Sequence, residues 1–101
     1  MNRNLVEAYS YYKEKYAPFI IFFRIGNECR AYFDDAKLLN QVVGASLSDG
    51  YVAYPYGDIL DVVSEIYCHN ISAKVISYKT PSGQYGIPDI NEIINGEKED
   101  F

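Results

Sequence analysis

The sequence has little of what metal sites, disulfide frameworks and membrane anchors require. It contains one histidine, two cysteines and no tryptophan in 101 residues. Cys29 and Cys68 have no second cysteine or histidine at ligand spacing, since His69 directly follows Cys68, and this pattern predicts neither a disulfide framework nor a metal site. The longest apolar run, residues 19–23, is far shorter than the about 20 residues that cross a bilayer. We therefore expect a reduced, cytoplasmic domain with no membrane association.

Catalytic signatures are also scarce. No phosphate-binding loop of the form G-x-x-x-x-G-K-[ST] occurs, and the length is that of one domain. Cys68 and His69 would point about 100° apart on a helix, without a third group to orient them. The paired acids Asp34 and Asp35 stand at an expected helix start, where carboxylates cap the helix and favour its dipole. We expect no enzymatic activity, no catalytic residue and no cofactor.

Negative charge is concentrated towards the C-terminal end. Residues 1–88 hold 8 Lys and Arg against 9 Asp and Glu, whereas residues 89–101 hold 1 against 5. This distribution predicts one nearly neutral domain over residues 1–88, followed by a solvated acidic tail over residues 89–101 that includes a short helix. Because a domain without a net positive field gains little from counterion release, its own affinity for DNA should be weak.

The hydrophobic pattern predicts a small single α+β domain, with a mixed β-sheet flanked by helices. Helices are expected over residues 4–16, 34–43, 58–69 and 89–95, and strands over residues 19–25, 28–33, 51–54, 73–78 and 85–87. Asn4 is the expected N-cap of the first helix. Pro18 should end that helix and Gly44 the second, because the residue before proline avoids the helical region and glycine favours C-caps.

Apolar and aromatic side chains fall at regular spacings that predict the buried faces. The first helix carries a stripe of Leu5, Tyr9, Tyr12 and Tyr16, and the third carries one of Ile59, Leu60, Val63, Ile66 and Tyr67. In the second strand, period two places Cys29, Ala31 and Phe33 on one face and Glu28, Arg30 and Tyr32 on the other.

Residues 22–37, F-F-R-I-G-N-E-C-R-A-Y-F-D-D-A-K, resemble the F-Y-R-M-G-D-F-Y-E-L-F-Y-D-D-A-K segment in the N-terminal mismatch-recognition domain of the MutS family. Residues 53–60, A-Y-P-Y-G-D-I-L, are similar to the family's G-I-P-Y-H-A-x-x-x-Y-L, and residues 73–77 take the place of its V-A-I-C-E strand. The matches run in order over residues 5–80. The resemblance implies that this chain has the MutS domain I fold as a short, stand-alone unit.

The departures from the family pattern affect the residues that read DNA. The resemblance implies a stacking Phe and a hydrogen-bonding Glu, but these positions hold Glu28 and Arg30, and the Tyr between them is Cys29. A carboxylate cannot stack in an opened base step as an aromatic ring does. Gly57 replaces the His that follows Pro-Tyr. We therefore expect a mismatch-repair scaffold without mismatch readout.

Two functions fit these observations. The first is weak, non-specific binding of double-stranded DNA, either alone or beside a separate repair protein, through Glu28, Arg30, Asn27, Arg24, Lys13 and Lys15. The second is a protein–protein interaction module that kept the fold and lost DNA binding, for example as a homodimer. Its expected contact surface comprises the strand face of Glu28, Arg30 and Tyr32 and the cluster of Tyr51, Tyr54 and Tyr56.

Overall fold

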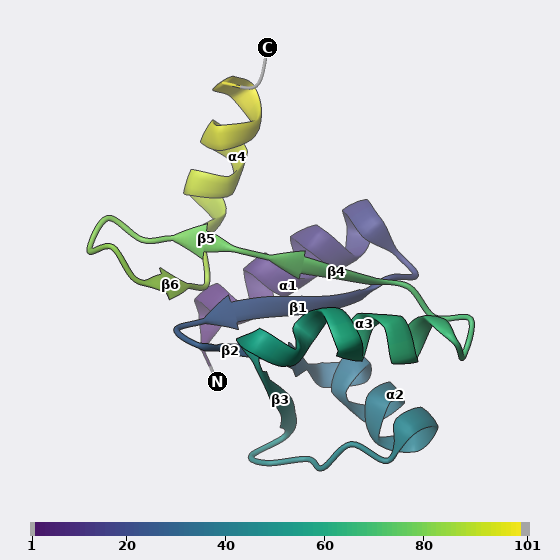
Figure 1. Cartoon of the computed structure of the whole chain (residues 1–101). Helices are drawn as coiled ribbons and strands as arrows, with labels where there is room; N and C mark the ends of the chain where they lie inside the picture. The colour runs from purple at the N-terminus through teal and green to yellow at the C-terminus, as the bar shows by residue number, and fades with distance from the viewer. Residues whose placement is uncertain (1, 100–101) are drawn as a thin grey trace.

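The computed structural model describes the backbone of residues 2–99 and the side chains of residues 2–96. In chain order the elements are α1 (Arg3–Tyr16), β1 (Ile20–Ile25), β2 (Glu28–Tyr32), α2 (Phe33–Val43), β3 (Tyr51–Pro55), the 3₁₀ turn η1 (Tyr56–Asp58), α3 (Ile59–Tyr67), β4 (Ala73–Ile76), β5 (Tyr78–Lys79), β6 (Tyr85–Gly86) and α4 (Ile90–Glu99). Figure 1 shows α3 in front of the sheet and α1 behind it. The α+β class is confirmed.

Four strands form a mixed sheet in the order β3-β2-β1-β4. β1 pairs antiparallel with β2 and parallel with β4, and Phe22 is the partner of both Ala31 and Val75. Residues 20–23 are fully buried, as expected for a central strand with both faces covered. The expected fourth strand divides at Ser77, after which Tyr78 and Lys79 pair with Gly86 and Tyr85 in a separate two-stranded sheet.

The sheet separates two hydrophobic clusters. The cluster on the side of α2 and α3 contains Ile20, Phe22, Cys29, Ala31, Ala36, Leu39, Val52, Ile59 and Ile66. The cluster on the side of α1 and α4 contains Ala8, Ile21, Phe23, Tyr32, Ile76 and Ile93. Tyr9, Tyr12 and Tyr16 pack against this second cluster, so the expected aromatic stripe of the first helix is confirmed. Ile93 packs α4 onto the same body, whereas the side chains of residues 97–101 lie outside the described part of the tail.

Three local expectations are corrected. The N-cap of α1 is Asn2, whose side-chain oxygen accepts hydrogen bonds from the backbone N–H groups of Asn4 and Leu5. Phe33 does not extend the β2 face of Cys29 and Ala31. It begins α2 with φ 56° and packs against the opposite cluster, so the chain turns one residue earlier than the strand pattern indicated.

The third correction concerns α3. Ile59 and Ile66 are buried as expected, but Leu60 is 79% exposed and Tyr67 66% exposed. Val62, which the stripe omitted, packs with Val63 against the α2–α3 cluster. Leu60 and Tyr67 therefore lie on a second apolar side of this helix, about a quarter turn or more from the buried side of Ile59 and Ile66.

Candidate nucleic-acid interface

The turn between β1 and β2, Gly26-Asn27, is held by two elements from distant parts of the chain. The Gly26 N–H donates to the Tyr85 carbonyl of β6 at 3.0 Å, and the Tyr56 N–H of η1 donates to the Asn27 carbonyl at 2.7 Å. Gly26 has φ 59°, a conformation that favours glycine at this tight turn. These contacts place η1 and the β5–β6 hairpin around the residues nominated from the sequence.

Glu28 and Arg30 form an ion pair immediately after this turn. The Glu28 carboxylate lies 2.8 Å from Nη2 and 2.9 Å from Nε of Arg30. The guanidinium carbon lies 4.6 Å from the ring centre of Tyr51 on the neighbouring strand. Burial acts to lower the pKa of Arg30, but hydrogen bonding with Tyr32 and Glu28 outweighs it and raises that pKa overall. The charges of Glu28 and Arg30 therefore neutralise each other.

Arg24, the last polar residue of β1, is held in a different way. Its guanidinium carbon lies 3.6 Å from the ring centre of Tyr56 and 3.7 Å from that of Tyr85. Its Nε donates to the Gly26 carbonyl at 3.2 Å. No carboxylate in the described part of the chain forms an ion pair with Arg24. The two rings fix the guanidinium while its terminal nitrogens have no hydrogen-bond partner among the described residues.

The nominated lysines do not join this site. Lys13 lies at the opposite end of β1, where its ammonium contacts the Asp35 carboxylate at 2.9 Å and the Phe19 carbonyl at 2.7 Å. The Lys15 ammonium lies 5.4 Å from the ring centre of Tyr16. The six nominated residues therefore divide into a group around the turn and a pair of lysines on α1.

Asp35 is the acid that the sequence assigned to helix capping, and the structure gives it a further contact. It is 3% exposed, and its carboxylate accepts a hydrogen bond from the Ile21 N–H at 2.9 Å as well as from Lys13. The N-cap of α2 is Tyr32, with no side-chain cap. Asp35 therefore joins α2 to β1 and α1, and does not serve as an N-cap.

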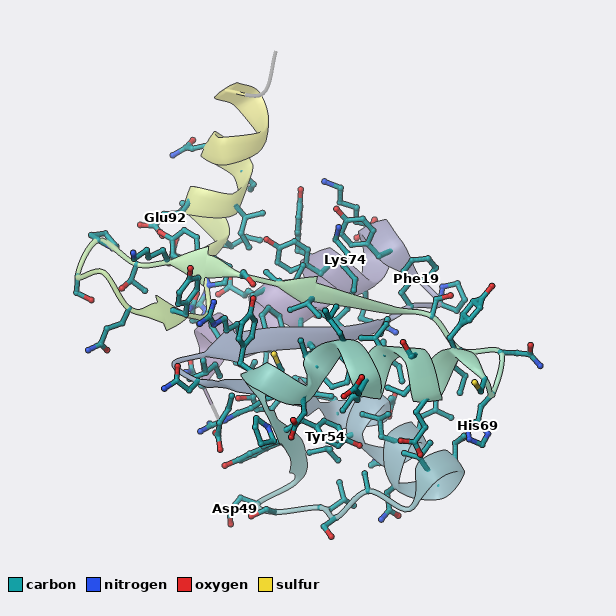
Figure 2. The ribbon with its side chains drawn as sticks, in the orientation of Figure 1. Phe19, Asp49, Tyr54, His69, Lys74 and Glu92 are labelled. Carbon is teal, nitrogen blue, oxygen red and sulfur yellow. The ribbon has the colours of Figure 1, made fainter. Side chains whose placement is uncertain are left out.

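The nominated tyrosines occupy separate places. Tyr32 is 9% exposed in the α1–α4 cluster, with Tyr51 beside it at 5.5 Å between ring centres. Tyr54 (labelled in Figure 2) packs on the other side of the sheet, with 6.1 Å between its ring centre and that of Phe22. Burial raises its pKa. Tyr56 covers Arg24. They do not form one exposed patch, because residues three apart on a strand face opposite sides.

Sequence reasoning missed Tyr85 as part of this site, because only tertiary contacts bring β6 to the turn.

Cys29 is buried, which raises the pKa of its thiol, with the charge of Arg24 acting in the opposite direction. Cys68 is exposed. Within the part of the chain that was described, no three His, Cys, Asp or Glu side chains group to hold a metal ion, and no helix is long and apolar enough to span a bilayer.

Comparison with known families gives one finding. The model of the family described as MutS domain I matches residues 3–77, about three-quarters of the 101 residues. This range includes α1, the four-stranded sheet, α2 and α3, with the β1–β2 turn inside it. The curated proteins that were compared include no match.

Proposed function

Since the chain belongs to the MutS domain I family and is thereby related to DNA mismatch repair, we propose that it contacts the backbone of duplex DNA weakly and does not recognise mismatches. The proposed role is binding without catalysis. Asp34, Asp35 and the Cys68-His69 pair have no part in it. The proposal concerns one region, the β1–β2 turn with the residues that surround it.

The Glu28–Arg30 ion pair supports the proposal that the protein does not recognise mismatches. A wedge that enters a base step needs a flat apolar side chain, because it replaces the stacking that the base loses. Glu28 supplies a carboxylate, 47% exposed, which phosphates repel. Arg30 is engaged by that same carboxylate and by the ring of Tyr51. Neither side chain supports recognition of a mispaired base.

Arg24 supports the proposed contact with the DNA backbone. A guanidinium stacked between two rings keeps its plane fixed, so its terminal N–H groups are oriented before any ligand arrives. Phosphate oxygens are ligands that such a planar fork accepts with two parallel hydrogen bonds. No described carboxylate competes for this cation. Arg24 is therefore the proposed phosphate contact, and Tyr56 and Tyr85 are its positioning residues.

The charge of the domain limits the affinity. Residues 1–88 carry a balance of −1, so few counterions would be released on binding. We expect binding that is detectable only at low salt, weakens as salt is added with the small slope that few phosphate contacts give, and is equal for paired and mismatched duplexes.

Fluorescence anisotropy of labelled duplexes, fully paired and with one G·T mismatch, tests the proposal at low and moderate salt. Arg24→Gln should weaken binding about threefold to tenfold at low salt and lower the salt dependence, since one phosphate contact is lost. Arg3→Gln is the matched control, because it removes an equal charge from a guanidinium paired with Glu7 at 3.1 Å on the surface of α1. A preference for the mismatched duplex would refute the proposed lack of mismatch recognition, and an equal loss in both variants would refute the role of Arg24.

A further inference from the structure

The two edges of the four-stranded sheet differ in how their own chain occupies them. At the β3 edge, the Tyr51 N–H donates to the Ser48 carbonyl at 3.0 Å, and the Ser48 N–H donates to the Tyr51 carbonyl at 2.8 Å. Pro55, which has no N–H, ends that strand. β4 forms the other edge, and no described segment pairs with its outer side (Figure 1). The β4 edge is therefore open to a further strand.

The register with β1 identifies the backbone groups that remain at this open edge. The Ile20 N–H donates to the Ser72 carbonyl at 2.9 Å, and Ile20 is the register partner of Ala73. Because alternate residues of a strand turn their N–H and C=O to the same side, Ser72 and Lys74 face β1. The N–H and C=O groups of Ala73 and Val75 therefore point outwards. These groups have no hydrogen-bond partner among the described residues.

One flank of the open edge is apolar. The side chains of Ala73 and Val75 pack against the α2–α3 cluster. An open groove of about 410 Å³ lies on this flank, lined by Phe19, Val63, Ser64, Tyr67, Ser72 and Ala73. Tyr67 is 66% exposed and Phe19, labelled in Figure 2, is 38% exposed. A strand added to β4 directs every second side chain to this apolar flank.

The opposite flank, towards α1, is basic. Lys74 is exposed, and its ammonium lies 5.2 Å from the ring centre of Tyr16. The Lys15 ammonium lies 5.4 Å from the centre of the same ring. Glu92 lines the groove between β4, α1 and α4, but its carboxylate accepts a hydrogen bond from the Tyr78 hydroxyl. The remaining side chains of an added strand therefore meet two ammonium groups.

These flanks distinguish a second copy of this chain from a different partner. In an antiparallel pair of two β4 strands, Ala73 and Val75 of one copy bond to Val75 and Ala73 of the other. This register places the two Lys74 side chains directly opposite each other, and like charges in that position are destabilising. An exposed lysine is a common protection of an edge strand against such self-pairing. An acidic residue opposite Lys74 is attracted instead.

We propose that the outer edge of β4 binds an extended segment of a partner protein in an antiparallel arrangement. The segment alternates apolar residues, opposite Ala73 and Val75, with acidic residues, one of which lies opposite Lys74. Main-chain hydrogen bonds supply affinity, and the apolar and basic flanks supply specificity. This interaction goes beyond the proposed DNA contact, because Arg24 and its two tyrosines take no part in it.

Two short, end-capped peptides of equal length provide the probe: one alternates valine with glutamate, the other valine with lysine. Backbone amide shifts of the isotope-labelled protein, followed by NMR during titration, report both affinity and location. We expect the glutamate peptide to bind at least about fivefold more tightly, because its acids are attracted by Lys74 and Lys15. The largest shifts should fall in residues 72–77. Equal binding of the two peptides, no binding, or shifts confined to another surface would overturn the proposal.

Methylation of single backbone nitrogens in the glutamate peptide separates strand pairing from attraction to a charged surface. The N–H of the central valine donates to β4 in the proposed arrangement, whereas the N–H of the next glutamate points away. N-methylation of that valine should remove binding, and N-methylation of the glutamate should leave it unchanged. The amide protons of Ala73 and Val75 should exchange with solvent more slowly in the complex. An equal effect of the two methyl groups would contradict strand pairing.

A charge reversal tests the basic flank. Lys74→Glu should reverse the preference, so that the lysine peptide binds more tightly than the glutamate peptide. Lys37→Glu is the matched control, because Lys37 is exposed on α2, which packs against β2 and β3. An unchanged preference in Lys74→Glu would overturn the proposal. Light scattering that shows a dimer which dissociates when the glutamate peptide is added would assign the edge to a second copy, with the same consequence.

Discussion

Two ion pairs in this molecule have the same chemistry and opposite surroundings. Lys13 and Asp35 meet at 2.9 Å where β1 begins, and Arg30 and Glu28 meet at 2.8 Å where β2 begins. The side chain of Asp35 is 5% exposed and that of Glu28 is 47% exposed. Asp35 also accepts the backbone N–H of Ile21. The comparison shows that the distance between the charged atoms does not by itself indicate how much an ion pair contributes to the stability of the fold.

Burial decides the difference in free energy. Removing one member of a buried pair leaves an unpaired charge and an unsatisfied N–H, and typically costs about 3–5 kcal/mol. An exposed pair is screened by water and salt and typically contributes about 0–1 kcal/mol. Asp35 thus holds α1, α2 and β1 together, whereas Glu28 and Arg30 pair with each other on β2, where the Glu28 carboxylate is half exposed.

Asp35→Ala is expected to have the largest effect, a loss of about 3–5 kcal/mol in the free energy of unfolding. Urea unfolding followed by circular dichroism measures it. Asp34→Ala is the matched control, because Asp34 is exposed in the same first turn of α2. Similar losses in the two variants would mean that the buried contacts of Asp35 are not the source of its contribution.

Substituting both residues of the Glu28–Arg30 pair tests whether these two positions determine mismatch recognition. Glu28→Phe combined with Arg30→Glu places beside the β1–β2 turn the stacking and hydrogen-bonding side chains that the resemblance to the family implies. Stacking on a base contributes about 1–3 kcal/mol, so we expect a preference for a G·T mismatch of about tenfold in the anisotropy assay. If the double variant still binds paired and mismatched duplexes equally, the scaffold has lost more than these two residues.

The Asp35 site also has a consequence at alkaline pH. Burial, together with the nearby carboxylates of Asp35 and Asp34, raises the pKa of Tyr9 well above its usual value near 10. The unfolded chain therefore ionises Tyr9 at lower pH than the folded protein does. This contribution to stability is complete below pH 10 and is lost as the pH rises towards the folded-state pKa.

Tyr9→Phe should remove that part of the alkaline loss. We expect the free energy of unfolding to fall less between pH 9 and pH 11 in the variant than in the parent chain, as measured by urea unfolding at each pH. Tyr67→Phe is the control, because Tyr67 is exposed. Identical pH dependence in Tyr9→Phe and the parent would contradict the raised pKa.

Glu28→Gln should have the smallest effect on stability, within about 1 kcal/mol, because the pair is half exposed. Thermal unfolding at low and high salt measures it, and the small difference from the parent should shrink as salt screens the pair. A loss as large as that of Asp35→Ala would remove the distinction between the two pairs.

Much of the fold could be predicted because its signals are local. Residues 20–23 are apolar at each position and form a strand buried on both faces. Gly44 ends α2 with φ 70°, as its position in the pattern indicated. The R-x-G and D-D-A-K segments identified the family, and the family match covers the residues that carried the resemblance.

The sequence predictions were wrong where the environment of a side chain depends on which elements pack around it. Leu60 and Tyr67 have helical spacing that fits a buried stripe, but α3 buries the side that carries Ile59 and Ile66 and leaves Leu60 and Tyr67 exposed. Tyr51 and Tyr54 are close in sequence, yet they lie on opposite sides of the sheet. Lys13 has the charge of a DNA contact, but its ammonium is bound by Asp35.

The sequence by itself determined most of the elements and the family, because each depends on residue type and short-range spacing. Only the tertiary structure decided the environment of each charge. Arg24, Arg30 and Lys13 look alike in sequence, but one is stacked between two rings, one is neutralised on a strand and one supports a buried acid. The partners come from distant segments, and the free energy of a charge depends on those partners and on its exposure to water.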